Sequence, residues 1–593
     1  MTHYRSNLRD LEFNLFEVHR LGDYIASIAD MDVGNARDVI REIERLAGQE
    51  WSASFVEADR ADIELVDGNV TLPPALKASL AALRAGGWDR VGLDEDMGGT
   101  PIPHLLFWAT QELLLGANPT ATFYAGGPLF ARVMFEEGTE EQRDLARMMI
   151  ERGWAGSMVL TEPDAGSDVG SGLTKAHQVE GNTYHLEGVK RFITGGEHDA
   201  TENIVHLVLA RPDGAGPGTK GLSLFIVPKF LVNPDGTLGE RNGVVATRIE
   251  HKLGLKGSVT AELTLGEQQP AVGYLVGGVH DGIRQMFRVI EHARMMIGTK
   301  AAATLSTGYL TALEYAASRV QGPDLASAAD KSAPRVPIIR HPDVRRLLLL
   351  QKAHAEGLRA LWTYAAWSKD QALLTGEERW ARRADFLLPL VKGYSSEKSF
   401  ELLAQSLQVL GGSGYTEDYP IEQYLRDAKI DSIYEGTTGI QAMDLFFRKI
   451  IRDQGLTVAN LVAEMSDFVK SGDGADDLSQ EKEVLGRMID DLQAHLGAAV
   501  GHLLASREEP TQIYKAGLHL TPLLESMAEV VISWQILRHA EIAGASARDD
   551  DFLTGKIVSA RFFVRHVAPK VAARRAAAEV EDGELMELAD AAF

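Results

Sequence analysis

Apolar residues recur at helical spacing up to about residue 154 and again after residue 281, whereas shorter apolar runs fill the part between. In the first part, Pro73-Pro74 and Gly86-Gly87 separate the apolar segments. The segments predicted to be helical or core there are 36–46, 75–83, 105–115 and 129–135. This pattern predicts an N-terminal helical extension over residues 1–70 and a helical domain over residues 71–154.

Between residues 155 and 280, segments rich in β-branched and apolar residues follow one another closely, separated by Gly and Pro. The predicted strands are 157–160, 184–193, 204–210, 222–227, 244–249, 259–265 and 271–276. They indicate an antiparallel β-domain. The glycines at 214, 216 and 218 lie between strands and no Gly-Lys-Ser/Thr follows, which argues against a P-loop or Rossmann site.

Helical periodicity returns in segments 283–319, 342–369 and 380–410, and a further Ala-rich helical region follows from residue 454 to residue 593. We therefore expect a four-helix-bundle-like domain over residues 281–453 and an additional C-terminal helical domain over residues 454–593.

Glu435 lies just before a predicted helix, in the stretch Tyr434-Glu435-Gly436-Thr437-Thr438. Thr437 or Thr438 suits the N-cap, and Gly436 leaves the neighbouring backbone open to a ligand. Two interpretations stand at this point: Glu435 is a catalytic base, or it is an acid that only complements the helix dipole.

Composition narrows the class of protein. The 593 residues carry a formal charge of −24, which argues against a nucleic-acid partner, and there is no cysteine to form a disulfide or a thiolate metal site. No apolar run of signal-peptide or membrane-span length is present, so we expect a cytoplasmic protein. No metal motif is found, and Glu197-His198-Asp199 is interpreted as an exposed polar loop.

The segment from Gln408 to Gln441 resembles the C-terminal signature of the acyl-CoA dehydrogenase family: Q-x-L-G-G-x-G-Y, then Y-P-I-E, R-D-A-K-I and Y-E-G-T. The resemblance implies the fold of that family, with FAD as cofactor and acyl-CoA as substrate. His341-Pro342-Asp343-Val344-Arg345-Arg346 and the terminal Asp590-Ala591-Ala592-Phe593 resemble its long form, the broad-range mycobacterial type, which is related to 3-methylmercaptopropionyl-CoA dehydrogenases.

The resemblance also implies individual roles. It makes Glu435 the catalytic base, and it assigns Gly436, Arg294 and Ser167 to substrate binding. In Met158–Gly170, the T-E-P-x-A-G-S-D block lines the flavin in the family, with Thr161 on the ring and Ser167 on the pyrophosphate; K-x-F-I-T supplies Phe192 and Thr194. The residues expected to bind FAD are Met158, Leu160, Thr161, Ser167, Phe192, Thr194, Arg319, Gln321, Gln408, Gly411, Gly412 and Thr437. Of these, the resemblance implies that Arg319 and Gln321 reach the FAD pyrophosphate of the neighbouring subunit and that Gln408, Gly411 and Gly412 touch its adenosine half.

Three positions qualify this assignment. Some relatives carry the catalytic glutamate one residue before the motif arginine, where this chain has Ala293, so Glu435 remains the base. Phe192 replaces the commoner tryptophan, and Gly439 replaces a glutamine that contacts adenine in many relatives. Without the resemblance, Arg294 and Arg319 are most simply surface or structural arginines, and the Thr161 block is a turn.

The implied reaction is α,β-dehydrogenation of acyl-CoA to trans-2-enoyl-CoA, with electrons passed to an electron-transferring flavoprotein. An acyl-CoA oxidase on the same fold and a non-catalytic acyl-CoA- or FAD-binding scaffold remain alternatives. Because the extra C-terminal domain occupies a surface that shorter members use to form tetramers, the resemblance implies a homodimer. The preferred acyl chain length is not predicted.

Overall fold

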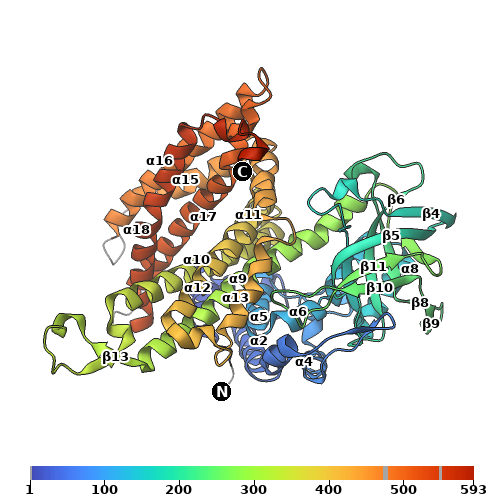
Figure 1. The fold of residues 1–593 in the computed structure, drawn as a ribbon, viewed down its shortest axis with the longest axis horizontal. Coiled ribbons are helices and arrows are strands. Elements are labelled where there is room, and N and C mark those ends of the chain that lie inside the picture. The colour runs from blue at the N-terminus through green and yellow to red at the C-terminus, as the bar shows by residue number, and fades with distance from the viewer. Residues whose placement is uncertain (1–2, 472–477, 547–549) are drawn as a thin grey trace. The chain divides into compact units, whose positions relative to one another are not determined.

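The computed structural model describes residues 3–471, 478–546 and 550–593 (Figure 1). The chain divides into two compact units, the first made of residues 1–6 and 28–293 and the second of residues 7–27 and 294–593. Each unit is described by itself. No helix in the described ranges combines the length and the apolar character that a membrane crossing requires.

Short helices form the first half of unit 1. They are α2 (Val33–Leu46), α3 (Phe55–Arg60), α4 (Pro74–Ala85), α5 (His104–Ala117), α6 (Pro119–Tyr124), α7 (Gly127–Glu137) and α8 (Glu140–Glu151). Their ends follow local signals: Asp32 and Thr139 each make a capping box at the start of a helix, and Pro74 opens α4. Helix α5 is buried on most of its surface, which explains its continuous apolar sequence.

A mainly antiparallel sheet forms the second half of unit 1, as expected. Its strands are β3 (Ala155–Val159), β4 (Lys175–Glu180), β5 (Thr183–Thr194), β6 (Ile204–Pro212), β7 (Ser223–Pro228), β10 (Val244–Ile249), β11 (Thr260–Leu265) and β12 (Ala271–Leu275), and β8 (Phe230–Val232) and β9 (Leu238–Arg241) form a separate ribbon. Since β4 pairs with both β5 and β6, the strands β5, β12, β7, β6 and β4 close into a ring. The pairs β3–β6 and β4–β6 are parallel, which the sequence pattern did not indicate.

The two faces of β6 pack on different cores. Val208 and Ala210 face the interior of the sheet, while Val205, Leu207 and Leu209 pack against α7 and α8. The nearly continuous apolar sequence of this strand is therefore that of a strand buried on both sides.

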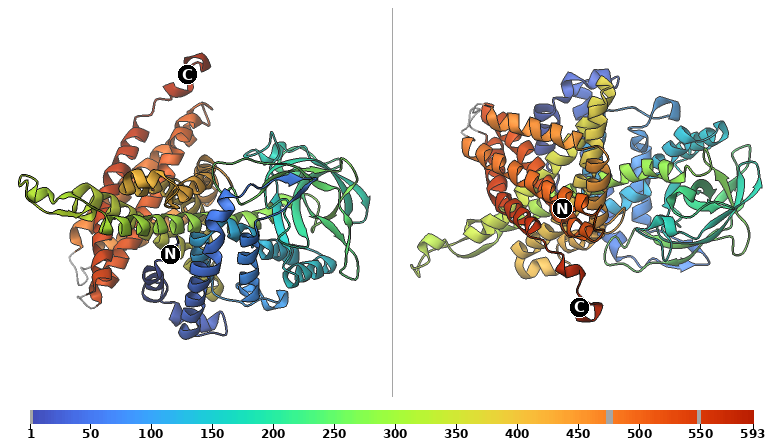
Figure 2. Two further views of the ribbon diagram at one scale, coloured as in Figure 1. Left: turned by 60° about the horizontal axis from the view of Figure 1, so that its bottom comes forward. Right: turned by 90° about the horizontal axis from the view of Figure 1, so that it is seen from above.

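Unit 2 is helical. Helix α9 (Gly282–Ser318) begins in unit 1 and continues here, followed by α10 (Pro342–Thr375), α11 (Glu378–Pro389), the π-helical turn η12 (Leu390–Tyr394), α12 (Ser395–Leu410), α13 (Ile421–Ala428), α14 (Thr438–Met443) and the π-helical η15 (Asp444–Ile451). The C-terminal region adds α15 (Leu456–Lys470), α16 (Ser479–Ala505), α17 (Gln512–Ala545) and α18 (Asp551–Glu579). Figures 1 and 2 show α16, α17 and α18 side by side.

The N-terminal helix α1 (Leu8–Glu12) is tied to the far end of the same unit. The fully buried carboxylate of Asp10 pairs with Arg359 on α10 and, at 2.7 Å, with Lys556 on α18. Two cations thus compensate one buried anion, and Glu356 lies 3.3 Å from Lys556.

Candidate active site

Glu435 occupies a short loop between η14 (Lys429–Ser432) and α14. Its backbone is left-handed, with φ of 55°, and Gly436 follows with φ of 85°. A left-handed glutamate costs on the order of 1 kcal/mol, so the surrounding contacts must hold it. Helix α14 begins at Thr438, because the side chain of the preceding Thr437 caps the N–H of Ile440 at 3.4 Å.

Three side chains fix this loop. The Gln441 amide donates to the carbonyl oxygens of Glu435 and Gly436, each at 3.1 Å. The Lys392 ammonium donates to the carbonyl of Gly436 at 2.6 Å. The Thr438 hydroxyl donates to Glu397 of α12 at 2.6 Å. The backbone that carries Glu435 is therefore held by three helices.

The polar groups of Glu435 itself remain available. Within the described residues, neither its carboxylate nor its main-chain N–H makes a hydrogen bond to another protein group. Burial raises the pKa of Glu435 from 4.5 to about 7, and the cations Lys392 and Arg294 limit the rise. A carboxylate with this pKa is ionised in an appreciable fraction at neutral pH and accepts a proton more readily than an ordinary glutamate.

A buried ion pair lies behind the loop. Lys300 of α9 donates to both oxygens of Asp431, at 2.6 and 2.8 Å, and to the Asp427 carbonyl at 2.9 Å. The hydroxyl of Tyr434 donates to Asp431 at 3.0 Å. The residue before Glu435 is thereby anchored to α9.

Arg294, the motif arginine, is buried on α9 and donates to Asp444 at 2.6 Å. Asp444 follows α14 and also lies 3.3 Å from Arg448. The structure thus places Arg294 within electrostatic reach of Glu435 and joins it directly to the helix that follows the Glu435 loop.

In unit 1, the Thr161 block is tied to strand β5. The carbonyl of Thr161 accepts from the N–H of Arg191 at 2.9 Å, and the buried Lys190 donates to the Leu160 carbonyl and to Glu162, both at 2.9 Å. Glu162 also accepts from the N–H groups of Leu173 and Thr174. These contacts lower the pKa of Glu162, although burial alone raises it. Thr161 is therefore held beside the strand that carries Phe192 and Thr194.

Phe192 stands out on this strand. Its φ is 61°, close to a break in the β5–β11 register, and 53% of its side chain is exposed. A bulge of this kind re-aims a side chain. An aromatic ring turned outward by its backbone is suited to stack on a flat ligand.

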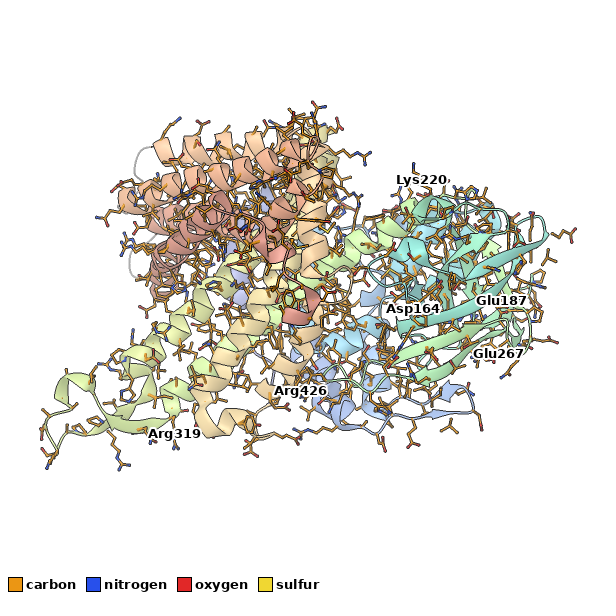
Figure 3. All side chains as sticks on the ribbon, turned by 45° about the horizontal axis from the view of Figure 1, so that its top comes forward. Asp164, Glu187, Lys220, Glu267, Arg319 and Arg426 are labelled. Carbon is orange, nitrogen blue, oxygen red and sulfur yellow. The ribbon has the colours of Figure 1, made fainter. Side chains whose placement is uncertain are left out.

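The residues around Phe192 fit a polar cofactor. The hydroxyls of Thr161, Ser167 and Thr194 hydrogen-bond to no other group in the described part of the chain, and Gly166 has open space where a side chain would stand. Met158 lies on β3, partly buried against the core. Three hydroxyls without a described partner, two of them on or bonded to the strand that carries the exposed ring, suit the expected FAD site. Asp164, labelled in Figure 3, lies in the same exposed turn.

The residues expected to meet the pyrophosphate and the adenosine half of the neighbouring subunit's FAD lie at one end of unit 2. The ends of α9 and α12 pack together through Ala316, Val409 and Leu410. Around them lie Arg319, which donates to Gln321 at 3.2 Å, and the exposed Gln408, Gly411 and Gly412. Gly411 has φ of 59°, and open space surrounds both glycines. Figure 3 shows Arg319 where the arm formed by β13 (Val320–Pro323) and β14 (Arg335–Pro337) begins.

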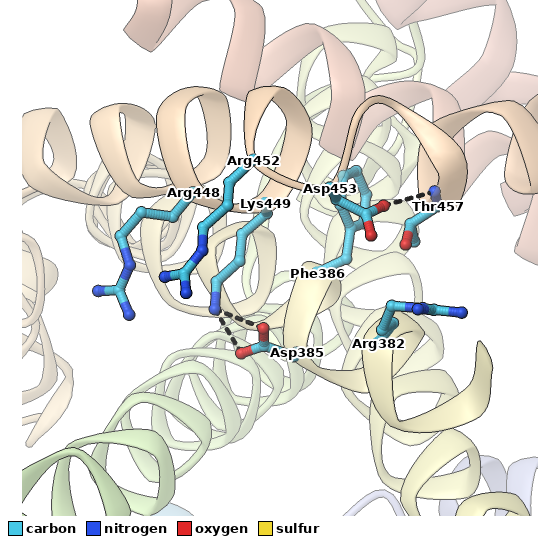
Figure 4. A pocket seen from close by; sticks show the side chains of 8 residues that line it. All are labelled: Arg382, Asp385, Phe386, Arg448, Lys449, Arg452, Asp453 and Thr457. Atoms are coloured by element: carbon cyan, nitrogen blue, oxygen red, sulfur yellow. Dashed lines mark hydrogen bonds and ion pairs between the residues drawn. The ribbon is translucent and has the colours of Figure 1, made fainter. Parts of the chain in front are cut away.

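A basic hollow of about 270 Å³ lies between η15 and α11 (Figure 4). Its lining residues are Arg382, Asp385, Phe386, Arg448, Lys449, Arg452, Asp453 and Thr457. Lys449 is paired with Asp385 at 2.5 Å, and Asp453 caps the N–H of Thr457 at 2.7 Å. The exposed Arg452 has no partner among the described residues. The hollow therefore suits an anionic group.

The prediction that Glu197-His198-Asp199 is an exposed polar loop was wrong for Glu197 and His198, whereas Asp199 is exposed. Glu197 and His198 are buried, because Glu197 pairs with Lys229 and, at 3.0 Å, with Arg241. Burial, with the nearby Lys229, lowers the pKa of His198 to about 3. These residues hold strands together, and no cluster in the described residues has the composition of a metal site.

The sequence analysis missed Lys392 and Gln441, both of which hold the Glu435 loop. A signal was available for the lysine, since Lys392 is the only charged residue in the apolar run from Phe386 to Tyr394. A lone cation in such a run must find a buried acceptor. Gln441 carries no comparable signal.

Comparison with known proteins agrees with the fold and the motifs. Residues 157–267 match the model for the acyl-CoA dehydrogenase middle domain, residues 280–448 the model for the acyl-CoA dehydrogenase C-terminal domain, and residues 461–589 the model described as acetyl-CoA dehydrogenase C-terminal like.

Two curated relatives cover nearly the whole chain. The broad-specificity linear acyl-CoA dehydrogenase FadE5 of Mycobacterium tuberculosis is 50% identical over 611 residues, covering 100% of both chains. The 3-methylmercaptopropionyl-CoA dehydrogenase of Ruegeria pomeroyi is 34% identical, covering 95% of this chain and 96% of its own. Among solved structures, an acyl-CoA dehydrogenase from Bacillus anthracis complexed with FAD shares the fold, with a TM-score of 0.74 at 20% identity over 94% of this chain and 90% of that one. This chain therefore belongs to the acyl-CoA dehydrogenase family of FAD-dependent enzymes.

Proposed function

We propose that this protein removes the α-proton and the β-hydride of acyl-CoA thioesters, yielding trans-2-enoyl-CoA, with Glu435 as the base. The observation that supports this most directly is the carboxylate of Glu435, which burial makes more basic and which no described protein group hydrogen-bonds. The close similarity to a broad-specificity linear acyl-CoA dehydrogenase supports linear acyl-CoA substrates.

The chain's own groups supply the proton chemistry. The main-chain N–H of Glu435 is free to donate to the thioester carbonyl, on which negative charge develops as the α-proton leaves. The carboxylate of Glu435 takes that proton. Bound FAD supplies the acceptor for the hydride. Thr161, Ser167, Phe192 and Thr194 would hold the flavin in unit 1. The residues around Arg319 would hold the pyrophosphate and the adenosine half of the FAD bound by the neighbouring subunit.

The basic hollow between η15 and α11 is the proposed contact for the phosphates of CoA. On a chain with a formal charge of −24, a negatively charged substrate needs a local concentration of positive charge. Arg448, Lys449 and Arg452 provide it on the helix that begins three residues after Glu435.

A homodimer is proposed from the arm and its surroundings. Tyr415 is 91% exposed, and Val320 and Leu325 on the arm are also exposed. These exposed apolar side chains lie on or near the segments that carry Arg319 and Gln408, which are expected to bind FAD. Such a surface suits an interface with a second subunit. Light scattering of the FAD-loaded protein should give a dimer; a monomer or a tetramer would contradict the proposal.

The role of Glu435 as the base is tested by anaerobic reduction of the bound flavin, which is measured as the loss of the flavin's absorbance. The wild type should be reduced by linear acyl-CoA esters. Glu435→Gln should keep the flavin and still bind acyl-CoA, but lose reduction by about 10⁴-fold or more, the upper end expected for a lost general base. Substantial reduction by Glu435→Gln would remove Glu435 from this role.

The electron acceptor separates the dehydrogenase from the oxidase. We propose an electron-transferring flavoprotein as the physiological acceptor. Turnover should therefore reduce that carrier and release little hydrogen peroxide in air. Peroxide formed in step with enoyl-CoA would favour an oxidase, and bound flavin without any turnover would favour a binding scaffold.

A further inference from the structure

Lys392 lies in the π-helical turn η12, between α11 and α12, and every residue of this turn is buried. Among the described residues, the only acceptor for its ammonium is the carbonyl of Gly436, at 2.6 Å. Burial lowers the pKa of Lys392 to about 8, although Asp431, Glu435 and Glu397 oppose the shift. A buried ammonium bonded to a neutral carbonyl is expensive, which makes a purely structural role a poor explanation.

The carbonyl that Lys392 holds belongs to Gly436, the residue that follows Glu435. Gln441 binds the same carbonyl and that of Glu435. Together these bonds fix the peptides on both sides of Gly436 and stabilise the left-handed backbone of Glu435. That backbone sets the direction of both the Glu435 carboxylate and its free N–H.

The turn that carries Lys392 is itself supported by the C-terminal region. A side chain at Gly393 would stand 3.2 Å from Leu524 of α17 and 3.3 Å from Gln441, so glycine allows both to approach. The hydroxyl of Tyr394 donates to Glu529 of α17 at 3.2 Å, and Glu529 is paired with Arg574 of α18 at 2.6 Å. Helices α17 and α18 thus reach the Glu435 loop through η12.

We propose that Lys392 is a positioning residue for Glu435, and that the C-terminal helices act on catalysis by holding η12 in place. This inference rests on the proposed role of Glu435 as the base. It assigns two functions to one ammonium: it orients the peptide next to the base, and its charge favours the ionised carboxylate.

The groups facing the pair come from several elements. Lys392 on η12 and Arg294 on α9 favour the ionised form of Glu435. Around Lys392 lie Asp431 on η14 and Glu397 on α12. Removal of the Lys392 charge should therefore raise the pKa at which Glu435 gains its proton.

The test uses FAD-loaded Lys392→Met and Lys392→Arg, with Lys229→Met as the matched control. Lys229 is another buried lysine, in unit 1, but its ammonium pairs with the carboxylate of Glu197. For each protein, the rate of anaerobic flavin reduction by a saturating acyl-CoA is measured from about pH 6 to about pH 9.

In Lys392→Met the flavin should be reduced about 10²-fold more slowly than in the wild type, which is the loss expected when a base is misplaced by about 1 Å. The FAD content and the affinity for acyl-CoA should stay within about threefold of the wild type. The rise of the Lys392→Met rate with pH should move to higher pH. Lys392→Arg should keep the wild-type pH dependence, because the charge remains. Lys229→Met should match the wild type in rate and pH dependence.

Two results would overturn the inference: a Lys392→Met rate within about threefold of the wild type, or a slow Lys392→Met whose pH dependence is unchanged.

Tyr394→Phe tests the same arrangement without removing a charge and should slow flavin reduction about threefold to tenfold with unchanged FAD content. A normal Tyr394→Phe rate would remove the role of the C-terminal helices. If Glu435→Gln reduces its flavin well, the proposed base itself fails; if only the Lys392 variants behave normally, this inference alone fails.

Discussion

Replacing Glu435 with glutamine should make the folded protein more stable, and only at neutral to alkaline pH. Glutamine keeps the shape of the side chain but cannot ionise. Because the folded protein raises the pKa of Glu435 from 4.5 to about 7, the unfolded chain ionises this group more readily than the folded protein does. The free energy of unfolding therefore falls as the pH rises from about 4.5 to about 7, and the loss is complete above about pH 7.

The size of the effect follows from the same shift. One pKa unit corresponds to about 1.4 kcal/mol, so the cost of ionised Glu435 is at most about 3.5 kcal/mol. The side chain is only partly buried, and solvent screening reduces the figure to about 1–2 kcal/mol. Glu435→Gln should recover this amount at pH 8 and almost none at pH 4.5.

The assay is thermal unfolding followed by circular dichroism at saturating FAD, at about pH 8, 6.5 and 5. Glu435→Gln should melt a few degrees above the wild type at pH 8, with the difference shrinking toward pH 5. Glu422→Gln is the control, because Glu422 pairs with Arg426 at 2.7 Å and its loss should not stabilise the protein. Equal melting temperatures at pH 8, or a larger gain in acid, would refute the reasoning.

Three further outcomes follow from the described contacts. Phe192→Ala should weaken FAD binding about tenfold in a flavin fluorescence titration, with little change in apoprotein stability because the ring is largely exposed; unchanged affinity would exclude it from the flavin site. Arg452→Ala should raise KM for acyl-CoA about threefold to tenfold at low salt with kcat unchanged, and the difference should fall at about 0.5 M NaCl; a salt-independent KM would contradict the phosphate contact. Asp10→Asn should destabilise the protein by about 3–5 kcal/mol in urea, because Arg359 and Lys556 would lose their buried anion; a loss below about 1 kcal/mol would contradict this.

The sequence predicted most elements well where the signal is local. Helices α2, α4 and α5 contain the predicted segments, and the strand predicted at 184–193 is β5. Thr437 was one of two candidates for the N-cap that the structure assigns to it. Periodicity and capping depend on neighbours within a few residues, so they can be read from one chain.

The hydrophobic pattern of the sequence could not predict which distant segments pair with one another. Nothing in the sequences of β3 and β6 shows that they pair in parallel or that β4 closes the ring. The burial of Glu197 depends on Lys229 and Arg241, which lie on later segments. Consecutive polar and charged residues are expected to be exposed unless residues distant in the sequence pair with them.

The candidate site divides in the same way. Glu435 and the Thr161 block were found through motifs, and their roles stay predictions that the experiments above decide. Lys392 lies more than forty residues before the loop it holds and acts through a main-chain carbonyl, which no residue pattern records.

The buried cluster of Asp10, Arg359 and Lys556 has a consequence for folding during synthesis. Lys556 lies 546 positions after Asp10, so the anion stays without one of its two cations until the ribosome has added 546 further residues. Domains synthesised early usually fold as they emerge. Here α1 must wait for α18, and in a nascent chain stalled before α18 the carboxylate of Asp10 would lack its Lys556 partner and lie open to chaperones and proteases.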